Sequence, residues 1–143
     1  MTIDTEEMEI KAVLEAVRKG HHDKDAAAIA ALYTPDAVIF DLAPPLAHTA
    51  DVSGLATWLD TWEGPVGLEE RDLTIEVSGG LAFCHGLSKV SATAKADGQR
   101  RQWWQRITVC LRRTEGAWKI VHEHASVPFY MDGSLRAAVD LEP

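Results

Sequence analysis

The sequence of 143 residues is poor in several features that would place it in a special class of protein. It has only two cysteines, Cys84 and Cys110, too few for the disulfide framework of a small secreted domain. No apolar run approaches the roughly 18 residues that a membrane-spanning helix needs. The acidic start, MTIDTEEMEI, lacks the basic and apolar regions of a signal peptide. We therefore expect a cytoplasmic protein with reduced thiols and no membrane partner.

Basic residues are also scarce, because 14 lysines and arginines stand against 22 aspartates and glutamates, a formal net charge of −8. A net acidic chain is a poor general partner for nucleic acid. The remaining composition is ordinary, with 46% hydrophobic and 25% charged residues. This balance is typical of one soluble globular domain, which we expect to span residues 1–143.

Apolar periodicity divides the chain into a helical first part and a strand-rich second part. Helical spacing predicts three helices, over 5–19, 26–33 and 53–63, with a strand over 37–41 before the last of them. From residue 68 onward the pattern predicts four strands, over 69–77, 81–95, 100–113 and 117–127. Glycine-containing turns separate these strands, so they should form an antiparallel meander. The predicted fold class is α+β, with helices first and one curved sheet second.

The turns between these strands determine which side chains share a face of the sheet. A two-residue turn at Asp97-Gly98 pairs Lys89 with Arg106. A three-residue turn ending at Gly116 pairs Arg106 with His124. These pairings place a cluster of basic side chains on one face.

The Gly79-Gly80 turn allows two pairings. A two-residue loop places Glu76 opposite Phe83, whereas a three-residue loop places Ile75 there. We choose the second, because apolar partners then share a face. One face then carries Leu73, Ile75, Val77, Phe83, His85, Leu87, Lys89, Trp104, Arg106, Thr108, Cys110, Trp118, Ile120, His122, His124 and Ser126.

We expect this face to lie under the helices and to line a pocket, because it passes from apolar to polar along its length. Asp41, at the end of an apolar strand, is the candidate general base, although it can equally bond the backbone of the following turn. Arg106 is a candidate for stabilising negative charge, or for a structural pair with an acid. His124, opposite Arg106, is the candidate orienting or acid–base residue. The expected ligand contacts are Trp58, Trp62, His85, Lys89, Trp104, Thr108, His122 and Ser126.

Two further expectations concern metal ions and assembly. His122 and His124 project to the same face, and with His85 they offer a metal site. We favour instead a cavity-lining and a backbone-bonded histidine, and predict no metal. His21 and His22 are expected to be solvated. The other face carries Trp103, Ile107, Val109, Leu111 and Val121, an apolar surface that predicts a homodimer.

The chain resembles the nuclear transport factor 2-like superfamily, and within it the SnoaL-like, ketosteroid-isomerase-like branch. The resemblance is carried by ALYTPDAVIFDLAPPL at 31–46, WWQRITVCLRRTEGAWKIVHEHASVPF at 103–129 and the closing MDGSLRAAVDLEP. It implies a cone-shaped half-barrel with a cavity between helices and sheet, and a homodimer formed through the sheet. It also places the general-base aspartate of the steroid isomerases at Asp41.

The expected function is small-molecule binding, and two alternatives stay open. The first is a cofactor-independent enzyme of the isomerase or cyclase type, acting on a carbonyl-bearing apolar substrate. In it Asp41 is the base, Arg106 stabilises negative charge and His124 assists. The second is a non-catalytic ligand-binding or association module, in which Arg106 and the histidines hold a small carboxylate.

Overall fold

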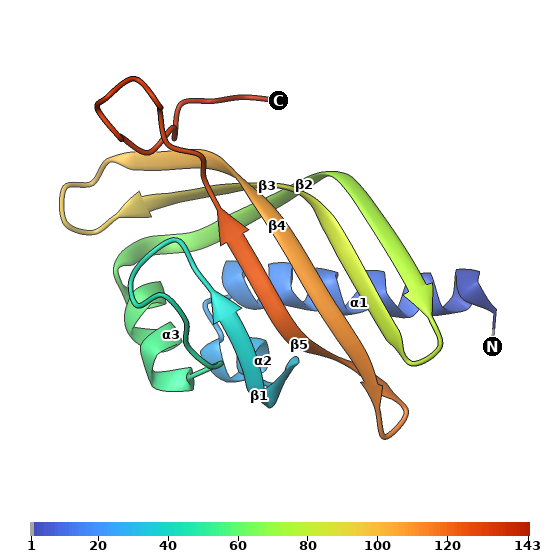
Figure 1. Ribbon diagram of the computed structural model, residues 1–143. Coiled ribbons are helices and arrows are strands. Elements are labelled where there is room, and N and C mark those ends of the chain that lie inside the picture. Colours follow the sequence, from blue (N-terminus) through green and yellow to red (C-terminus); the bar gives the residue numbers. More distant parts are fainter. Residues whose placement is uncertain (1) are drawn as a thin grey trace.

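The computed structural model describes residues 2–143, and it places the helices against one face of a single curved sheet (Figure 1). The elements in chain order are α1 (Ile3–His22), α2 (Ala26–Ala30), β1 (Tyr33–Phe40), α3 (Val52–Asp60), β2 (Trp62–Ser78), β3 (Leu81–Ala94), β4 (Arg100–Thr114) and β5 (Ala117–Ser126). The strand order is β1-β5-β4-β3-β2, and β1 alone runs parallel to its neighbour. The predicted α+β class and the long antiparallel meander are confirmed.

The helices begin where short polar side chains cap them. The Asp25 carboxylate accepts a hydrogen bond from the Ala28 backbone N–H at 3.1 Å and starts α2, as its position in the sequence suggests. Asp51 does the same for α3 through the Gly54 N–H at 2.9 Å. None of the helices among residues 2–143 is long and apolar enough to cross a membrane.

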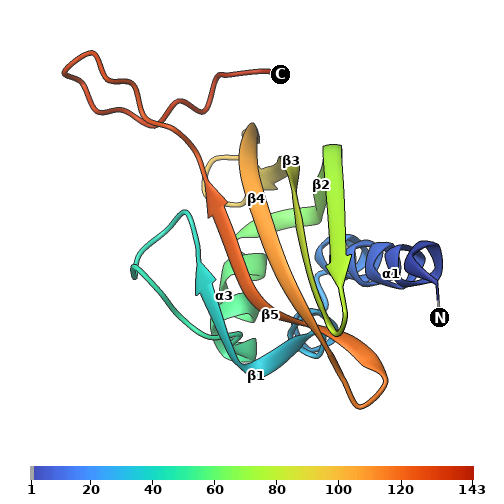
Figure 2. The same cartoon turned by 45° about the vertical axis from the view of Figure 1, so that its right-hand side comes forward.

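The core lies between the inner face of the sheet and the helices. Ile10 and Leu14 of α1, Ile29 of α2 and Leu59 of α3 are all buried. The sheet contributes Ala82, Cys84, Val90, Ala92, Val109, Leu111, Trp118 and Ile120. Each large aliphatic side chain buried in this way stabilises the fold by roughly 1.5–3 kcal/mol. Figures 1 and 2 show α1 and α3 on the same side of the sheet.

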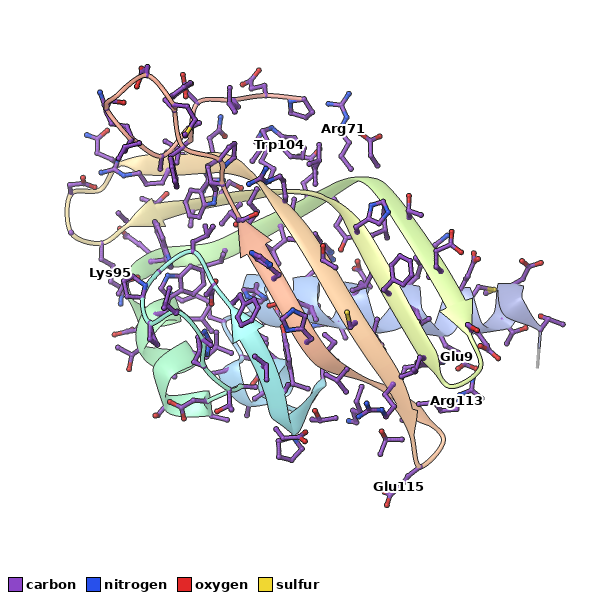
Figure 3. All side chains as sticks on the ribbon, in the orientation of Figure 1. Glu9, Arg71, Lys95, Trp104, Arg113 and Glu115 are labelled. Atoms are coloured by element: carbon purple, nitrogen blue, oxygen red, sulfur yellow. The ribbon has the colours of Figure 1, made fainter. Side chains whose placement is uncertain are left out.

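Near the β4–β5 turn, an ionic contact joins the sheet to α1. Arg113, near the end of β4, lies beside Glu9 of α1 in Figure 3. Its guanidinium is 3.8 Å from the Glu9 carboxylate and 3.5 Å from that of Glu6. The same guanidinium lies over the Trp118 ring, 5.0 Å from its centroid.

The predicted assignment of the two sheet faces is wrong, because two turns are one residue shorter than expected. The β4–β5 turn has two residues, so Leu111 and not Cys110 pairs with Ile120. The Gly79-Gly80 turn also has two residues, so Glu76 faces Phe83. A one-residue slip moves every side chain of a strand to the opposite face.

A β-bulge in β5, which the sequence analysis did not predict, also changes which side chains face the helices. Cys110 pairs with His122 while Leu111 pairs with Ile120, so Val121 is an extra residue in the ladder. Ile120 therefore points inward and His122 outward, although an uninterrupted strand would place both on one face. The Asp97-Gly98 loop is longer than predicted, and Lys89 pairs with Trp104, but this two-residue change leaves the faces unaltered.

The surface predicted to form the dimer is consequently part of the interior. Val109 and Leu111 are buried, and Trp103 and Ile107 are half-buried on the inner face. The outer face instead carries the side chains that the sequence analysis placed inside. After β5 the chain runs into a segment, 127–143, that extends away from the sheet (Figure 2).

Candidate functional site

A cavity of about 560 Å³ lies between the helices and the inner face of the sheet. Its wall is mainly apolar, with Leu14 and Val17 of α1, Leu55 of α3, and Ile107 and Val109 of β4. The polar and ionisable lining residues are His21, Tyr33, Asp41, His48, Asp51, Glu70, Ser88, Gln105 and Glu123. A large apolar cavity with few convergent polar groups is the usual form of a small-molecule site.

Asp41 and His48 form a hydrogen-bonded pair at one end of the cavity. Asp41 follows β1 directly, and the loop after it returns so that Ile39 and His48 exchange two backbone hydrogen bonds of 2.8 and 3.0 Å. This bridge brings His48 Nε2 to 3.2 Å from the Asp41 carboxylate. The second Asp41 oxygen accepts a hydrogen bond from the Leu42 N–H at 3.1 Å.

His48 donates a hydrogen bond to the Asp41 carboxylate. His48 Nδ1 lies 2.8 Å from the Thr49 carbonyl, which can only accept, so Nδ1 carries a hydrogen. Nε2 faces a carboxylate oxygen, and this contact is favourable only with a proton between the two atoms. The hydrogen bond to Thr49 and the neighbouring Asp41 raise the pKa of His48, which favours the imidazolium form.

Glu123 and Tyr33 form the second polar pair. Glu123 lies on the inner side of β5, opposite Val109 and next to Ile39 of β1. The buried Tyr33 hydroxyl donates a 2.8 Å hydrogen bond to Glu123 Oε1. Burial, opposed by this hydrogen bond and reinforced by the charge of Asp41, raises the pKa of Glu123 to about 7. Glu123 therefore exchanges its proton near neutral pH.

His21 is a third titratable group on the cavity wall, and the expectation that it is solvated is wrong. It belongs to the last turn of α1, where its Nδ1 donates to the Val17 carbonyl at 2.8 Å. Burial lowers the pKa of His21, so the ring is neutral at pH 7 and its Nε2 is an acceptor. The ring meets Trp58 edge to face, with centroids 6.3 Å apart.

The structure brings only part of the predicted site together. Asp41 and Trp58 line the cavity. Trp62 packs behind this wall, with ring centroids 5.9 Å from Trp58 and 6.4 Å from Trp103. The other predicted residues lie on the outer face: His85, Lys89, Trp104, Arg106, Thr108, His122, His124 and Ser126.

These outer-face residues have surroundings of their own. The rings of His122 and His124 pack edge-on against Phe40, at 4.8 and 5.4 Å. His122 Nδ1 lies 2.7 Å from the Val38 carbonyl. Lys89 and Trp104 border a small crevice of about 140 Å³ beside the C-terminal segment. Within residues 2–143, no group of three or more histidine, cysteine or acidic side chains is placed to hold a metal ion.

The site residues missed at the sequence level are Tyr33, His48, Glu123 and His21. One signal for the correct face was present in the sequence. Trp103, Ile107, Val109 and Leu111 alternate along one strand, a pattern typical of a face that packs on a core. Extended to β5 across the bulge, the same face includes Glu123.

Comparison with known proteins gives a family match that covers most of the chain. Residues 10–130 match the family model of the SnoaL-like domain. An NTF2-like protein of unknown function from Pseudomonas putida is 30% identical, with a TM-score of 0.86 and complete coverage of both chains. No curated protein matches the chain.

More distant solved structures share the fold. A candidate dehydratase of the NTF2-like family from Streptomyces avermitilis is 19% identical, with a TM-score of 0.75, over 87% of this chain and 97% of its own. A candidate aromatic ring hydroxylase from Novosphingobium aromaticivorans is 17% identical, with a TM-score of 0.74, over 88% and 91%. At these identities the likeness concerns architecture alone.

Proposed function

The chain belongs to the SnoaL-like family of the NTF2-like superfamily, and we propose that it is a cofactor-independent enzyme that moves protons on a carbonyl-bearing, largely apolar small molecule. The observation that carries this proposal is the pairing of Tyr33 with Glu123 beside Asp41 and His48 in one apolar cavity. Two carboxyl groups in different surroundings can take different roles in acid–base chemistry.

In this proposal Asp41 is the base and Glu123 is the acid. The Asp41 carboxylate, held by His48, removes a proton from the carbon next to the substrate carbonyl, and the electron pair of that bond forms an enolate. Protonated Glu123 donates a hydrogen bond to the enolate oxygen. The Tyr33 hydroxyl donates to the other carboxyl oxygen of Glu123 and keeps the group in place. Return of the proton from Asp41 to the same or a conjugated carbon completes exchange or isomerisation.

These assignments replace two of the roles expected from the sequence. Arg106 and His124 lie on the outer face and do not line the cavity. Glu123, in place of Arg106, has the role of stabilising negative charge. His48, in place of His124, has the role of orienting the base. Aromatic lining by Trp58 and Trp103 suits a substrate with a flat apolar body.

The alternative of a binding module for a small carboxylate has less support. That reading depended on Arg106, and neither lysine nor arginine is among the lining residues within the described chain. Asp41, Asp51, Glu70 and Glu123 would instead repel an anionic ligand. A neutral ligand held without catalysis uses the same wall, so an activity measurement has to separate these functions.

The test is deuterium exchange at the carbon next to the carbonyl of a tetralone, a fused aromatic ketone, followed by proton NMR in heavy water. The wild-type protein should accelerate exchange, and Asp41→Asn should slow it by roughly 100-fold or more. Glu123→Gln should slow it less, because an amide still donates a hydrogen bond. His124→Ala, on the outer face, is the matched control and should leave the rate unchanged. Exchange by Asp41→Asn at the wild-type rate would contradict the proposal, and a folded wild-type protein that binds the ketone without exchange would support the non-catalytic reading.

A further inference from the structure

A row of polar side chains crosses the cavity wall at a distance from Glu123 along β4. Glu70 of β2 pairs with Ser88 of β3, and Ser88 pairs with Gln105 of β4, so the three side chains lie side by side on the inner face. All three line the cavity. The acid–base chemistry proposed above uses none of them.

Ser88 is buried, with 4% of its surface exposed, and its hydroxyl has no hydrogen-bond partner among residues 2–143. Gln105 uses its carbonyl oxygen to accept from the Trp103 indole N–H at 3.1 Å, which leaves its amide nitrogen without a partner in the described chain. Neither atom is among the fully enclosed polar atoms that lack a partner in the described chain, so both are accessible from the cavity, where such groups usually meet water or a ligand.

The position of this row relative to Glu123 determines how far apart two polar groups of a ligand would have to be. Val109 lies opposite Glu123, and Gln105 is four residues away on the same strand. At roughly 3.3 Å a residue, Gln105 and the level of Glu123 are about 13 Å apart along β4. Between them Ile107 and Ala125 form an apolar stretch of wall.

We propose that Glu70, Ser88 and Gln105 bind a hydroxyl group at the far end of the ligand from its reacting carbonyl. This inference rests on the proposed function, because it takes the Asp41 and Glu123 end as the reacting end. A hydroxyl is the smallest group that donates to the Glu70 carboxylate and accepts from the Gln105 amide. A carbonyl has no hydrogen for Glu70, an ammonium has no lone pair for Gln105, and a carboxylate is repelled by Glu70. The ligand class is therefore an elongated apolar molecule with a polar group at each end.

The test compares two phenols of the same shape, dihydroxystilbene with a hydroxyl at each end and hydroxystilbene with one. Binding is measured by isothermal calorimetry. One additional hydrogen bond should make the bis-phenol bind roughly two- to tenfold more tightly to the wild-type protein. In Ser88→Ala and in Gln105→Met the affinity for the bis-phenol should fall to that of the mono-phenol. Thr108→Val, on the outer face of β4, is the control and should keep the wild-type preference.

Equal affinity of the two phenols for the wild-type protein would overturn the inference, as would a preference that survives in both variants. Absence of binding by either phenol to the folded protein would also overturn it. Thermal melting of each variant shows whether the fold is retained. None of these outcomes depends on proton exchange, so failure of the inference is distinguishable from failure of the proposed enzyme activity.

Discussion

Glu123 is the residue whose protonation should couple most strongly to folding. Its pKa is about 7 in the folded protein, against 4.5 as the ordinary value, because burial disfavours the carboxylate. The folded state therefore binds more protons than the unfolded state between pH 4.5 and 7. This contribution to stability is fully present below pH 4.5 and is lost as the pH rises through 7. The loss should amount to about 3 kcal/mol by pH 8.

Chemical denaturation of wild type and Glu123→Gln at pH 5 and pH 8 checks this expectation. The amide does not ionise, so the variant should lose less stability than the wild type between these two pH values. Asp36→Asn, at an exposed position of β1, serves as a control for the removal of one carboxylate. The same pH dependence in wild type and Glu123→Gln would show that Glu123 ionises normally in the folded protein.

At the residue scale, Asp41 and Trp58 were expected from the sequence to line a cavity and do line it, whereas the partners of Asp41 were not expected. Asp41 could be proposed because it directly follows an apolar strand and because the family resemblance places a general base at this position. His48 is seven residues farther on, and only the return of the loop to pair with Ile39 brings it to Asp41. Glu123 and Tyr33 are 90 residues apart and meet only because β1 adds to the sheet in parallel beside β5.

At the scale of elements, the order of helices and strands was predictable, whereas the register was not. Hydrophobic periodicity depends on local residues and correctly indicated the three helices and the meander. Which face is buried depends on single residues in turns and on the bulge at Val121. Glu115 and Gly116 both have positive φ, at 51° and 82°, the geometry of a two-residue hairpin turn. A non-glycine residue in that conformation is uncommon, whereas the longer turn expected from the sequence requires only Gly116 in the left-handed region.

The contact between α1 and α2 depends on the absence of a side chain at Gly20. A Cβ atom there would lie 2.5 Å from Cγ1 of Ile29, a buried residue of α2. Gly20→Ala should gain helix propensity but force Ile29 to move, for a net loss of roughly 1 kcal/mol or more. His21 follows directly, so the cavity wall should also shift.

Differential scanning calorimetry of Gly20→Ala should show a lowered melting temperature. Gly80→Ala is the matched control, because its added Cβ meets nothing within 4 Å, and its stability should stay within about 0.5 kcal/mol of the wild type. A melting temperature for Gly20→Ala at or above that of the wild type would mean that α2 adjusts without cost.

At the scale of the whole molecule, the corrected faces move the expected homodimer to a different surface. The outer face carries two continuous rows across four strands. One runs from Phe83 through Cys110 and His122 to Val38, and the other from His85 through Thr108 and His124 to Phe40. Phe83 is 46% exposed, Val38 43% and Phe40 37%. A contiguous apolar and aromatic surface of this kind is typical of a protein interface.

We expect two copies to associate through these rows, so that the wild-type protein sediments as a dimer at micromolar concentration. Phe83→Glu would place a carboxylate without a partner in the buried surface, at the β3 end of its row, which should shift the protein to monomer. Leu46→Glu is the control, because Leu46 is 97% exposed in the loop between β1 and α3 and its replacement should leave the dimer intact. A monomeric wild type, or a Phe83→Glu variant that remains dimeric, would show that the outer face does not carry the association. Neither substitution touches the cavity wall, so ketone exchange by the Phe83→Glu monomer would further show whether the acid–base site is complete within one chain.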